Sequence, residues 1–331
     1  MKLLDFSSAI FDSLSKEILW EKNILEFIQN WQNENDFILS QTSGSTGIPK
    51  TLKLPKSAMK MSAKMTGEFF RLQPGNTALL CMPVNFIAGK MMIVRAIELK
   101  LKLYCVEPKS QLKLNFTDSI DFVPMTPMQV ENSFGELAKI KTLLIGGAPL
   151  SDSLRTKLLE IPTRSFESYG MTETITHIGL KEISEEFFRT LNGISIRQDN
   201  RDCLVIQTPY FEEEIITNDI VELRNQSEFK WLGRFDNVIN SGGIKLFPEQ
   251  IEKKINPHIS EEFIITSIPD KVLGEKLILI VESKRIPNFQ LPTSNLGKYE
   301  IPKEIHFMEK FPRTESGKIQ REKLKENIIA L

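Results

Sequence analysis

Between about residues 36 and 170, short apolar runs alternate with longer segments that have helical periodicity. In chain order these segments read "FILSQ", "KSAMKMSAKMTGEFFRL", "TALLCM", "MMIVRAIEL", "KLYCV", "DFVPM", "KTLLIGG" and "SDSLRTKLLE". Strands that alternate with helices are typical of βαβ units, in which helices cover a mostly parallel sheet. The pattern therefore predicts an α/β fold whose ligands lie at the strand ends.

The rhythm changes after about residue 192. Closely spaced strands without intervening helices, "GISIR", "CLVIQT", "DIVELRN" and "FKWLG", predict a small antiparallel or barrel-like unit. Beyond "GRFDNVINSGG", the segments "FPEQIEKKI", "EFIITSI", "KLILIVES", "EIHFM" and "QREKLKENIIAL" predict an α+β unit. We therefore expect two domains, residues 1–235 and 236–331.

Composition and charge narrow the class of partner. The 331 residues include 42 Lys and Arg against 43 Asp and Glu, so the formal charge is -1 and nothing favours nucleic acid or an anionic membrane. Asp5 and Lys16 interrupt the N-terminal apolar residues, and no later run approaches the roughly 18 apolar residues of a membrane helix. A cytoplasmic protein with a small-molecule ligand is expected.

The three cysteines, Cys81, Cys105 and Cys203, are far apart and form no CxxC pair. An odd number at such spacing supports neither a disulfide framework nor a zinc site. We expect buried free thiols.

A polar, glycine-containing loop, "TSGSTGIPK", follows the first of these strands. Compared with the Walker pattern G-x-x-x-x-G-K-[ST], counted from Gly44, Pro49 replaces the second glycine, and proline has no N–H to give to a phosphate nest. The remaining hydroxyls, amides and one lysine still suit nucleotide phosphates, although a flexible surface loop is the alternative. The candidate phosphate ligands are Thr42, Ser43, Gly44, Ser45, Thr46, Gly47 and Lys50.

With three further stretches, "ESYGMTET", "WLGRFDNVINSGGIKLFPEQIE" and "PRTESGKIQREKL", this loop resembles the ordered motifs of the acyl- and aryl-CoA synthetase, luciferase and peptide-synthetase adenylation superfamily. The resemblance implies an adenylate-forming enzyme fold, here with a truncated parallel-sheet N-terminal domain, a small β unit and a mobile C-terminal domain. It also implies ATP, Mg²⁺ and CoA as ligands.

Residue by residue, the resemblance implies a nucleotide site. Tyr169 would stack on adenine beside the small residues of the turn after "KTLLI", which allow close backbone approach. Thr172 would bond the α-phosphate, and Glu173 would hold Mg²⁺. Asp219 and Arg234 would bind the ribose hydroxyls. The remaining candidates around the nucleotide are Gly146, Gly147, Ala148, Ser168, Gly170 and Met171.

The resemblance also implies two half-reactions. Lys318 would stabilise the transition state of adenylation, because a carboxylate that attacks a phosphate brings two anions together. Asp236 would be the hinge about which the C-terminal domain swings. Ser241, Gly242 and Gly243 would then line the entry path of a pantetheine thiol, the alternative being a simple glycine turn.

The acid is suggested by the stretches "MPVNFIAG", "LLIGGAPLS" and "ESYGMTETITHIGL", which look most like o-succinylbenzoate-CoA ligases of menaquinone biosynthesis. Such a substrate has an aromatic ring and a second carboxylate that does not react. Asn85, Phe86, Lys90 and Arg95 are the candidate substrate residues, Phe86 as part of an apolar wall and the last two as cations. His177 is a polar candidate near the acyl site, with a structural role as the favoured interpretation.

The chain departs from the superfamily at two points. Little sequence precedes the phosphate loop, which could leave an exposed face and favour a homodimer. "TND" replaces the usual "TGD" before the ribose aspartate, so the local backbone geometry can differ. The alternatives that stay open are another aryl- or fatty acyl-CoA ligase, an adenylation domain that loads a carrier protein, and a non-catalytic nucleotide-binding regulator.

Overall fold

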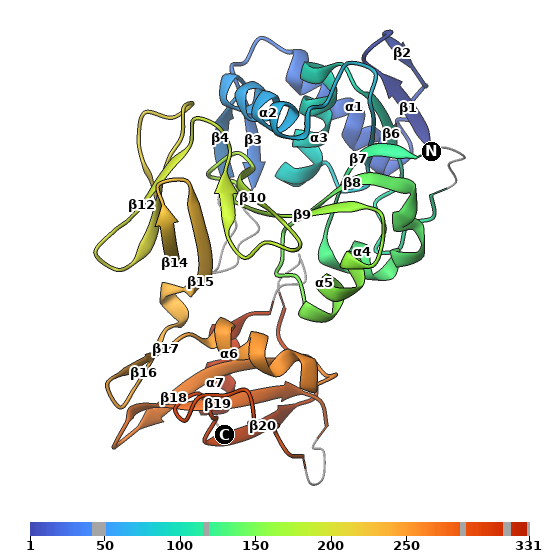
Figure 1. Cartoon of the computed structure of the whole chain (residues 1–331). Coiled ribbons are helices and arrows are strands. Elements are labelled where there is room, and N and C mark those ends of the chain that lie inside the picture. Colours follow the sequence, from blue (N-terminus) through green and yellow to red (C-terminus); the bar gives the residue numbers. More distant parts are fainter. Residues whose placement is uncertain (42–50, 115–118, 285–288, 314–318, 330–331) are drawn as a thin grey trace.

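The computed structural model describes residues 1–41, 51–114, 119–284, 289–313 and 319–329. These residues form two lobes that meet at the turn Phe235–Asn237 (Figure 1). The first lobe is built on a sheet of 13 strands, and the second on a smaller sheet of five. The α/β fold expected from the alternating segments is confirmed.

The centre of the large sheet is parallel, as predicted. Its parallel strands are, in spatial order, β6 (Lys102–Cys105), β5 (Thr77–Leu80), β7 (Ile120–Met125), β8 (Ile140–Ile145) and β9 (Arg164–Gly170). The helices of this lobe are α1 (Leu19–Gln32), α2 (Lys56–Phe70), α3 (Ile87–Leu99), α4 (Pro127–Asn132) and α5 (Asp152–Leu159). Because helices cover a parallel sheet, its central strands β5, β7 and β8 are mostly buried, without a strict alternation of buried and exposed residues.

The predicted antiparallel unit forms, but it is hydrogen-bonded to the parallel strands within one sheet instead of closing as a separate barrel. The path from β9 continues through β10 (His177–Glu182), β11 (Phe188–Thr190), β15 (Glu228–Arg234), β14 (Ile215–Asn225), β13 (Cys203–Gln207) and β12 (Ser195–Gln198). At the opposite edge, β1 (Lys2–Asp5) and β2 (Ile10–Phe11) pair antiparallel. The chain thus passes from parallel to antiparallel pairing at β9 and β10.

One strand has a different partner from the one predicted. The run "FILSQ" forms β3 (Phe37–Gln41), which pairs antiparallel with β4 (Thr51–Pro55) and not with the parallel strands. This hairpin brackets the phosphate-loop segment, residues 42–50, which lies outside the described residues.

The C-terminal lobe has the α+β composition expected from its sequence. Its elements are β16 (Ile239–Ser241), β17 (Ile244–Leu246), α6 (Pro248–Ile255), β18 (Phe263–Asp270), β19 (Gly274–Glu282), β20 (Glu304–Met308) and α7 (Arg321–Ile329). Successive residues of β18 face opposite sides of the sheet, so Ile265 packs in a cluster with Ile251 of α6 and Ile264 in a cluster with Leu324 of α7.

The apolar core of the N-terminal lobe extends from Leu4 to Phe229 and is separate from the two clusters of the C-terminal lobe. All three cysteines are buried and free, as predicted, and burial raises the pKa of the Cys81 thiol to about 12. Within the described ranges, no helix is long and apolar enough to cross a membrane. The predicted homodimer stays a prediction.

Candidate active site

The carboxyl ends of β8 and β9 bring the small residues of the predicted adenine turn beside the tyrosine strand. Because β8 and β9 are parallel, with Ile145 opposite Glu167, the residues that follow each strand meet at one edge. A Cβ on Gly146 would lie 2.3 Å from the hydroxyl of Ser168, so any other residue here would force that hydroxyl to move. Gly147 has φ +89°, a conformation that also favours glycine.

Tyr169 lies next on β9 and is hydrogen-bonded to Asp219, one of the two predicted ribose residues. Its hydroxyl donates to the Asp219 carboxylate at 2.6 Å. The Trp231 indole N–H donates to the other carboxylate oxygen at 3.2 Å, and the Arg234 guanidinium is 3.5 Å from that oxygen. Cross-strand pairing of Asp219 on β14 with Arg234 on β15 sets this geometry. The chain itself therefore supplies two hydrogen-bond donors and a neighbouring cation to a carboxylate that is only 6% exposed.

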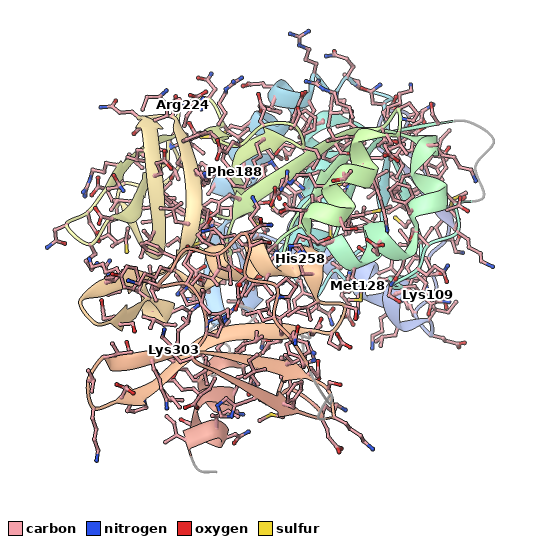
Figure 2. The ribbon with its side chains drawn as sticks, turned by 60° about the horizontal axis from the view of Figure 1, so that its bottom comes forward. Lys109, Met128, Phe188, Arg224, His258 and Lys303 are labelled. Atoms are coloured by element: carbon pink, nitrogen blue, oxygen red, sulfur yellow. The ribbon has the colours of Figure 1, made fainter. Side chains whose placement is uncertain are left out.

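Aromatic rings complete the surroundings of Tyr169. Its ring packs edge-on against Phe229 at a centroid distance of 5.0 Å and lies 6.0 Å from Phe188, which Figure 2 labels on β11. Burial, reinforced by the negative charge of Asp219, raises the pKa of the Tyr169 phenol well above its usual range. The phenol therefore stays protonated near neutral pH and keeps donating to Asp219.

A tight turn after β9 presents the predicted phosphate and metal residues. The Thr174 hydroxyl accepts from the Met171 N–H at 3.0 Å and donates to the backbone of this turn. This fixes Thr172 and the exposed Glu173 at the tip. Among the described residues, no cluster of three metal-ligating side chains occurs. A single carboxylate fits Mg²⁺ only with phosphate oxygens and waters as the other ligands, which is the usual arrangement for this ion.

A buried cation lies on the other side of this turn. Arg95 on α3 is 2% exposed, and its guanidinium donates to the Thr66 hydroxyl at 3.3 Å, the Thr176 hydroxyl at 3.1 Å and the Met92 sulfur at 3.7 Å. In the part of the chain that the structure describes, no carboxylate lies within ion-pair distance of it. His177 contacts both threonines, with its Nε2 3.1 Å from Thr66 and its Nδ1 3.4 Å from Thr176.

Burial changes the acid–base behaviour of this cluster. It lowers the pKa of Arg95 from 12.5 to about 9, so the side chain remains a cation at neutral pH. Burial, followed by the positive charge of Arg95, lowers the pKa of His177 well below 6.5. The cluster thus holds one positive charge and a neutral imidazole.

The other predicted substrate residues do not join Arg95. The Lys90 ammonium donates to the Leu39 carbonyl of β3 at 2.8 Å. Lys90 and Asn85 line a separate cavity of about 380 Å³ between α1, β3 and the start of α3. The Phe86 side chain, predicted as part of an apolar wall, is 45% exposed. The two cations that the sequence groups together, Lys90 and Arg95, therefore lie in different environments.

The predicted hinge residue, Asp236, accepts hydrogen bonds from two side chains. Its carboxylate accepts from the Asn218 amide at 3.2 Å and from the Arg234 guanidinium at 3.0 Å. Arg201 donates to the Asn218 side-chain oxygen at 2.9 Å and lies over the ring of Phe235. Asn218, the departure from the usual glycine, thus links the ribose strand to the hinge.

The glycine residues after the hinge form a β-hairpin turn. Gly242 and Gly243, with φ +58° and +82°, close a two-residue hairpin between β16 and β17 beside Ser241. The Gly242 N–H donates to the Leu273 carbonyl at 2.8 Å. Figure 1 shows this hairpin in the C-terminal lobe, away from the end of β9. Lys318 lies outside the described residues.

Three residues of the site were not predicted from the sequence: Thr66 and Thr176 beside Arg95, and Trp231 beside Asp219. Thr66 shares the buried face of α2 with Met59 and Ala63, so a threonine on an apolar stripe was the available signal. Thr176 lies within a quoted motif but carried no predicted role. Trp231 is the first residue of the "WLGR" motif. Its bond to Asp219 depends on the pairing of β14 with β15, which the sequence does not show.

Comparison with known proteins identifies the family of this chain. The family model of AMP-binding enzymes matches residues 7–192, more than half of the chain. A 2-succinylbenzoate–CoA ligase from Lactococcus lactis subsp. lactis is 24% identical over 96% of this chain and 77% of its own. A second, from Listeria monocytogenes serovar 1/2a, is 26% identical over 91% of this chain and 72% of its own.

Among solved structures, an acyl-CoA synthetase (AMP-forming)/AMP-acid ligase II-like protein from Dyadobacter fermentans is 33% identical and covers 96% of both chains, with a TM-score of 0.64. The o-succinylbenzoate CoA synthetase of Bacillus subtilis in complex with its acyl-adenylate has a TM-score of 0.75 at 19% identity, over 87% of this chain and 68% of its own, and so shares the fold. The chain belongs to the family of AMP-binding enzymes.

Proposed function

We propose that this chain is an AMP-forming acid–thiol ligase that joins o-succinylbenzoate to CoA through an acyl-adenylate. The family match, the relatives named 2-succinylbenzoate–CoA ligase and the predicted motifs support the reaction class. The observation that carries the choice of acid is Arg95, a buried cation for which the described residues provide no anion.

A buried guanidinium costs several kcal/mol in lost hydration unless an anion compensates it. Within the described ranges, Arg95 bonds two hydroxyl oxygens and a sulfur, which are neutral. Arginine has five N–H donors in a planar fork, and the contacts account for one on each nitrogen. Among the described residues, one N–H on Nη1 and one on Nη2 have no partner, and two such donors can bind a carboxylate in a bidentate manner.

This requirement separates the candidate acids. A benzoate or fatty acid has a single carboxylate, and adenylation converts that group into a mixed anhydride without the charge. o-Succinylbenzoate keeps a second carboxylate throughout the reaction, and that group would pair with Arg95. Lys90, which bonds a backbone carbonyl beside another cavity, has no part in this assignment.

In the first half-reaction, an oxygen of the reacting carboxylate attacks the α-phosphorus of ATP, the bond to pyrophosphate breaks, and the acyl-adenylate forms. Tyr169 and the glycine turn would hold adenine, Asp219 and Arg234 the ribose, and Thr172 the α-phosphate. Mg²⁺, held by Glu173 together with phosphate oxygens, would offset the charge at the reacting phosphate. Thr42 to Lys50 would hold the pyrophosphate, and Lys318 the attacking carboxylate.

In the second half-reaction, the CoA thiol loses its proton and attacks the acyl carbon, and AMP leaves with the bonding electron pair. We assign the domains to residues 1–235 and 236–331, with Asp236 at the hinge and Ser241, Gly242 and Gly243 on the thiol path. The break between the two sheets at Phe235–Asn237 and the separate apolar cores support this boundary.

The proposal is tested by pyrophosphate release and thioester formation with ATP, CoA and a panel of acids that includes o-succinylbenzoate, benzoate and a fatty acid. Turnover of the diacid is expected. Activity on the monocarboxylates alone would overturn the assigned acid, and no turnover with any acid would favour a non-catalytic regulator.

The same assay tests the role of Arg95. Arg95→Met is expected to lower kcat/KM for o-succinylbenzoate by about 10²- to 10³-fold, because a desolvated charge pair is lost. Arg224→Met is the matched control: Arg224, labelled in Figure 2, is exposed on β14, where it pairs with Glu228 and stacks on Phe187. Equal kcat/KM in Arg95→Met and wild type would contradict the proposal.

A further inference from the structure

His177 contacts the two hydroxyl groups that accept hydrogen bonds from Arg95, and no function has yet been assigned to it. The four side chains come from separate elements: Thr66 from α2, Arg95 from α3, Thr176 from the turn before β10, and His177 from the start of β10. His177 and Arg95 are 5% and 2% exposed. Because His177 and Arg95 share the same two hydroxyl groups, the imidazole can determine where Arg95 points.

The hydroxyl of Thr66 fixes one ring nitrogen. Thr66 donates its single O–H to the Ser62 carbonyl at 3.0 Å. Its oxygen is then an acceptor for the two remaining neighbours, the Arg95 Nε–H at 3.3 Å and the His177 Nε2 at 3.1 Å. The Nε2 atom must therefore carry the ring proton.

The other ring nitrogen then fixes Thr176. With its proton on Nε2, the neutral imidazole has an acceptor at Nδ1. The Thr176 hydroxyl, 3.4 Å away, donates its proton to Nδ1, and its oxygen is left to accept from Arg95 Nη2 at 3.1 Å. This assignment satisfies every contact, whereas the opposite tautomer would take the Thr66 proton from the Ser62 carbonyl.

We propose that His177, as the neutral Nε2–H tautomer, is a positioning residue that turns both threonine oxygens toward Arg95 and so aims the free edge of the guanidinium at the acid's unreacted carboxylate. This inference rests on the proposed function, because Arg95 is taken to bind that carboxylate. In this role His177 acts through Arg95 and does not itself contact the acid.

The charges around the ring agree with this role. Arg95 on α3 is the charged group that acts on His177, and α2 contributes the Thr66 hydroxyl. A protonated ring would have donors at both nitrogens, so Thr176 could no longer donate to Nδ1. A second buried cation beside Arg95 would also be unfavourable, since like charges repel strongly where water is excluded.

The tautomer can be read without turnover. The chain has three histidines, so the long-range ¹H–¹⁵N spectrum of the ring nitrogens is simple to assign, and the signals lost in His177→Gln identify this ring. A neutral ring with its proton on Nε2 is expected at pH 7. A proton on Nδ1, or a charged ring, would overturn the positioning role whatever the substrate is.

A double-mutant cycle tests the connection to Arg95. His177→Leu is expected to raise KM for o-succinylbenzoate about tenfold, since the bonds that orient a charged donor are lost, while KM for ATP stays unchanged. His177→Gln, which keeps a donor and an acceptor, should recover part of the loss. In the Arg95→Met background, His177→Leu should change KM no further.

Equal effects of His177→Leu with and without Arg95 would show that the ring only fills space, and would overturn the inference. Thr176→Val and Thr176→Ser give a second comparison if His177→Leu folds poorly: the valine should raise the same KM and the serine should not. Failure of the wild type to use the diacid would instead overturn the proposed function, and the ring spectrum separates the two failures.

Discussion

Two buried charges of the N-terminal lobe have opposite surroundings. The Asp219 carboxylate receives donors from Tyr169 and Trp231 and has the cation Arg234 beside it. The Arg95 guanidinium is just as buried, yet it bonds only neutral atoms in the described part of the chain. One charge is compensated by the chain itself and the other is not.

The difference separates what stabilises the fold from what waits for a ligand. Breaking a compensated charge leaves its partners buried and unpaired, which destabilises a protein. Removing an uncompensated charge relieves a desolvation cost and destabilises little. The two charges should therefore respond in opposite directions when each is replaced by an apolar side chain.

The largest effect on stability is expected from Asp219→Ala. The substitution leaves the Tyr169 hydroxyl and the Trp231 N–H without their acceptor and Arg234 without one of its two carboxylates. We expect the free energy of unfolding to fall by about 3 kcal/mol, measured by urea denaturation. Glu186→Ala, which breaks an exposed pair with Lys230, is the control and should cost less than about 1 kcal/mol.

The pH dependence of stability should reveal the neutral histidine beside Arg95. An unfolded histidine has a pKa near 6.5, and in the fold burial lowers the pKa of His177 well below this value. Above pH 6.5 the ring is neutral in both states and contributes nothing. Below it the unfolded chain gains a proton that the folded chain resists, so stability falls as the pH decreases.

His177→Gln removes this contribution. Between pH 7 and pH 5, the wild type should lose more unfolding free energy than the variant, with the difference bounded by about 1.4 kcal/mol for each pH unit below 6.5. Thermal or urea unfolding at several pH values measures it. The same loss in both proteins would show that the ring is protonated in the fold, contrary to the charge assignment around Arg95.

Arg95→Met is expected to leave the protein about 1 kcal/mol more stable, because the described residues give the buried cation no anion that the substitution would leave unpaired. Two hydroxyl acceptors lose their donor, which limits the gain. The diacid should raise the melting temperature of the wild type and not that of the variant. A loss of stability comparable to that of Asp219→Ala would mean that Arg95 is compensated within the chain.

Much of the fold could be predicted from the sequence because strands buried on both faces form continuous apolar runs that differ clearly from helical periodicity. Partners were harder to predict. The run that forms β3 has a normal strand pattern, but nothing in that pattern shows that it pairs with β4 instead of the parallel sheet. The strand β10 was missed because "HIGLKE" was considered as part of a site motif.

In the candidate site too, individual residues could be predicted from the sequence, but their partners could not. Arg95 could be named from its residue type and its motif, but its environment could not be predicted, because Thr66 and Thr176 are 29 and 81 residues away in the sequence. Lys90 had an equally good case in the sequence, and the helix turns it toward β3. Whether a charge is compensated depends on such distant neighbours, which only the tertiary structure brings together.

The smallest effect on stability is expected from Asn218→Ala. Asn218 precedes Asp219 on β14, but its side chain bonds Asp236 and Arg201. The Asn218 amide joins Asp236 to Arg201 in a partly exposed position, so its loss should change the free energy of unfolding by less than about 0.5 kcal/mol. The turn Phe235–Asn237 would lose one restraint, and thioester formation from pre-formed adenylate should become about twofold faster, since domain rotation needs freedom there. Single-turnover assays of the two half-reactions measure this.

Asn218→Asp is a poor substitute because it places a second carboxylate beside Asp236, whereas alanine removes the bond without adding charge. A drop in stability close to that of Asp219→Ala would contradict the comparison, because Asn218 would then belong to the set of groups that compensate Asp219 and not only to the link between the two lobes.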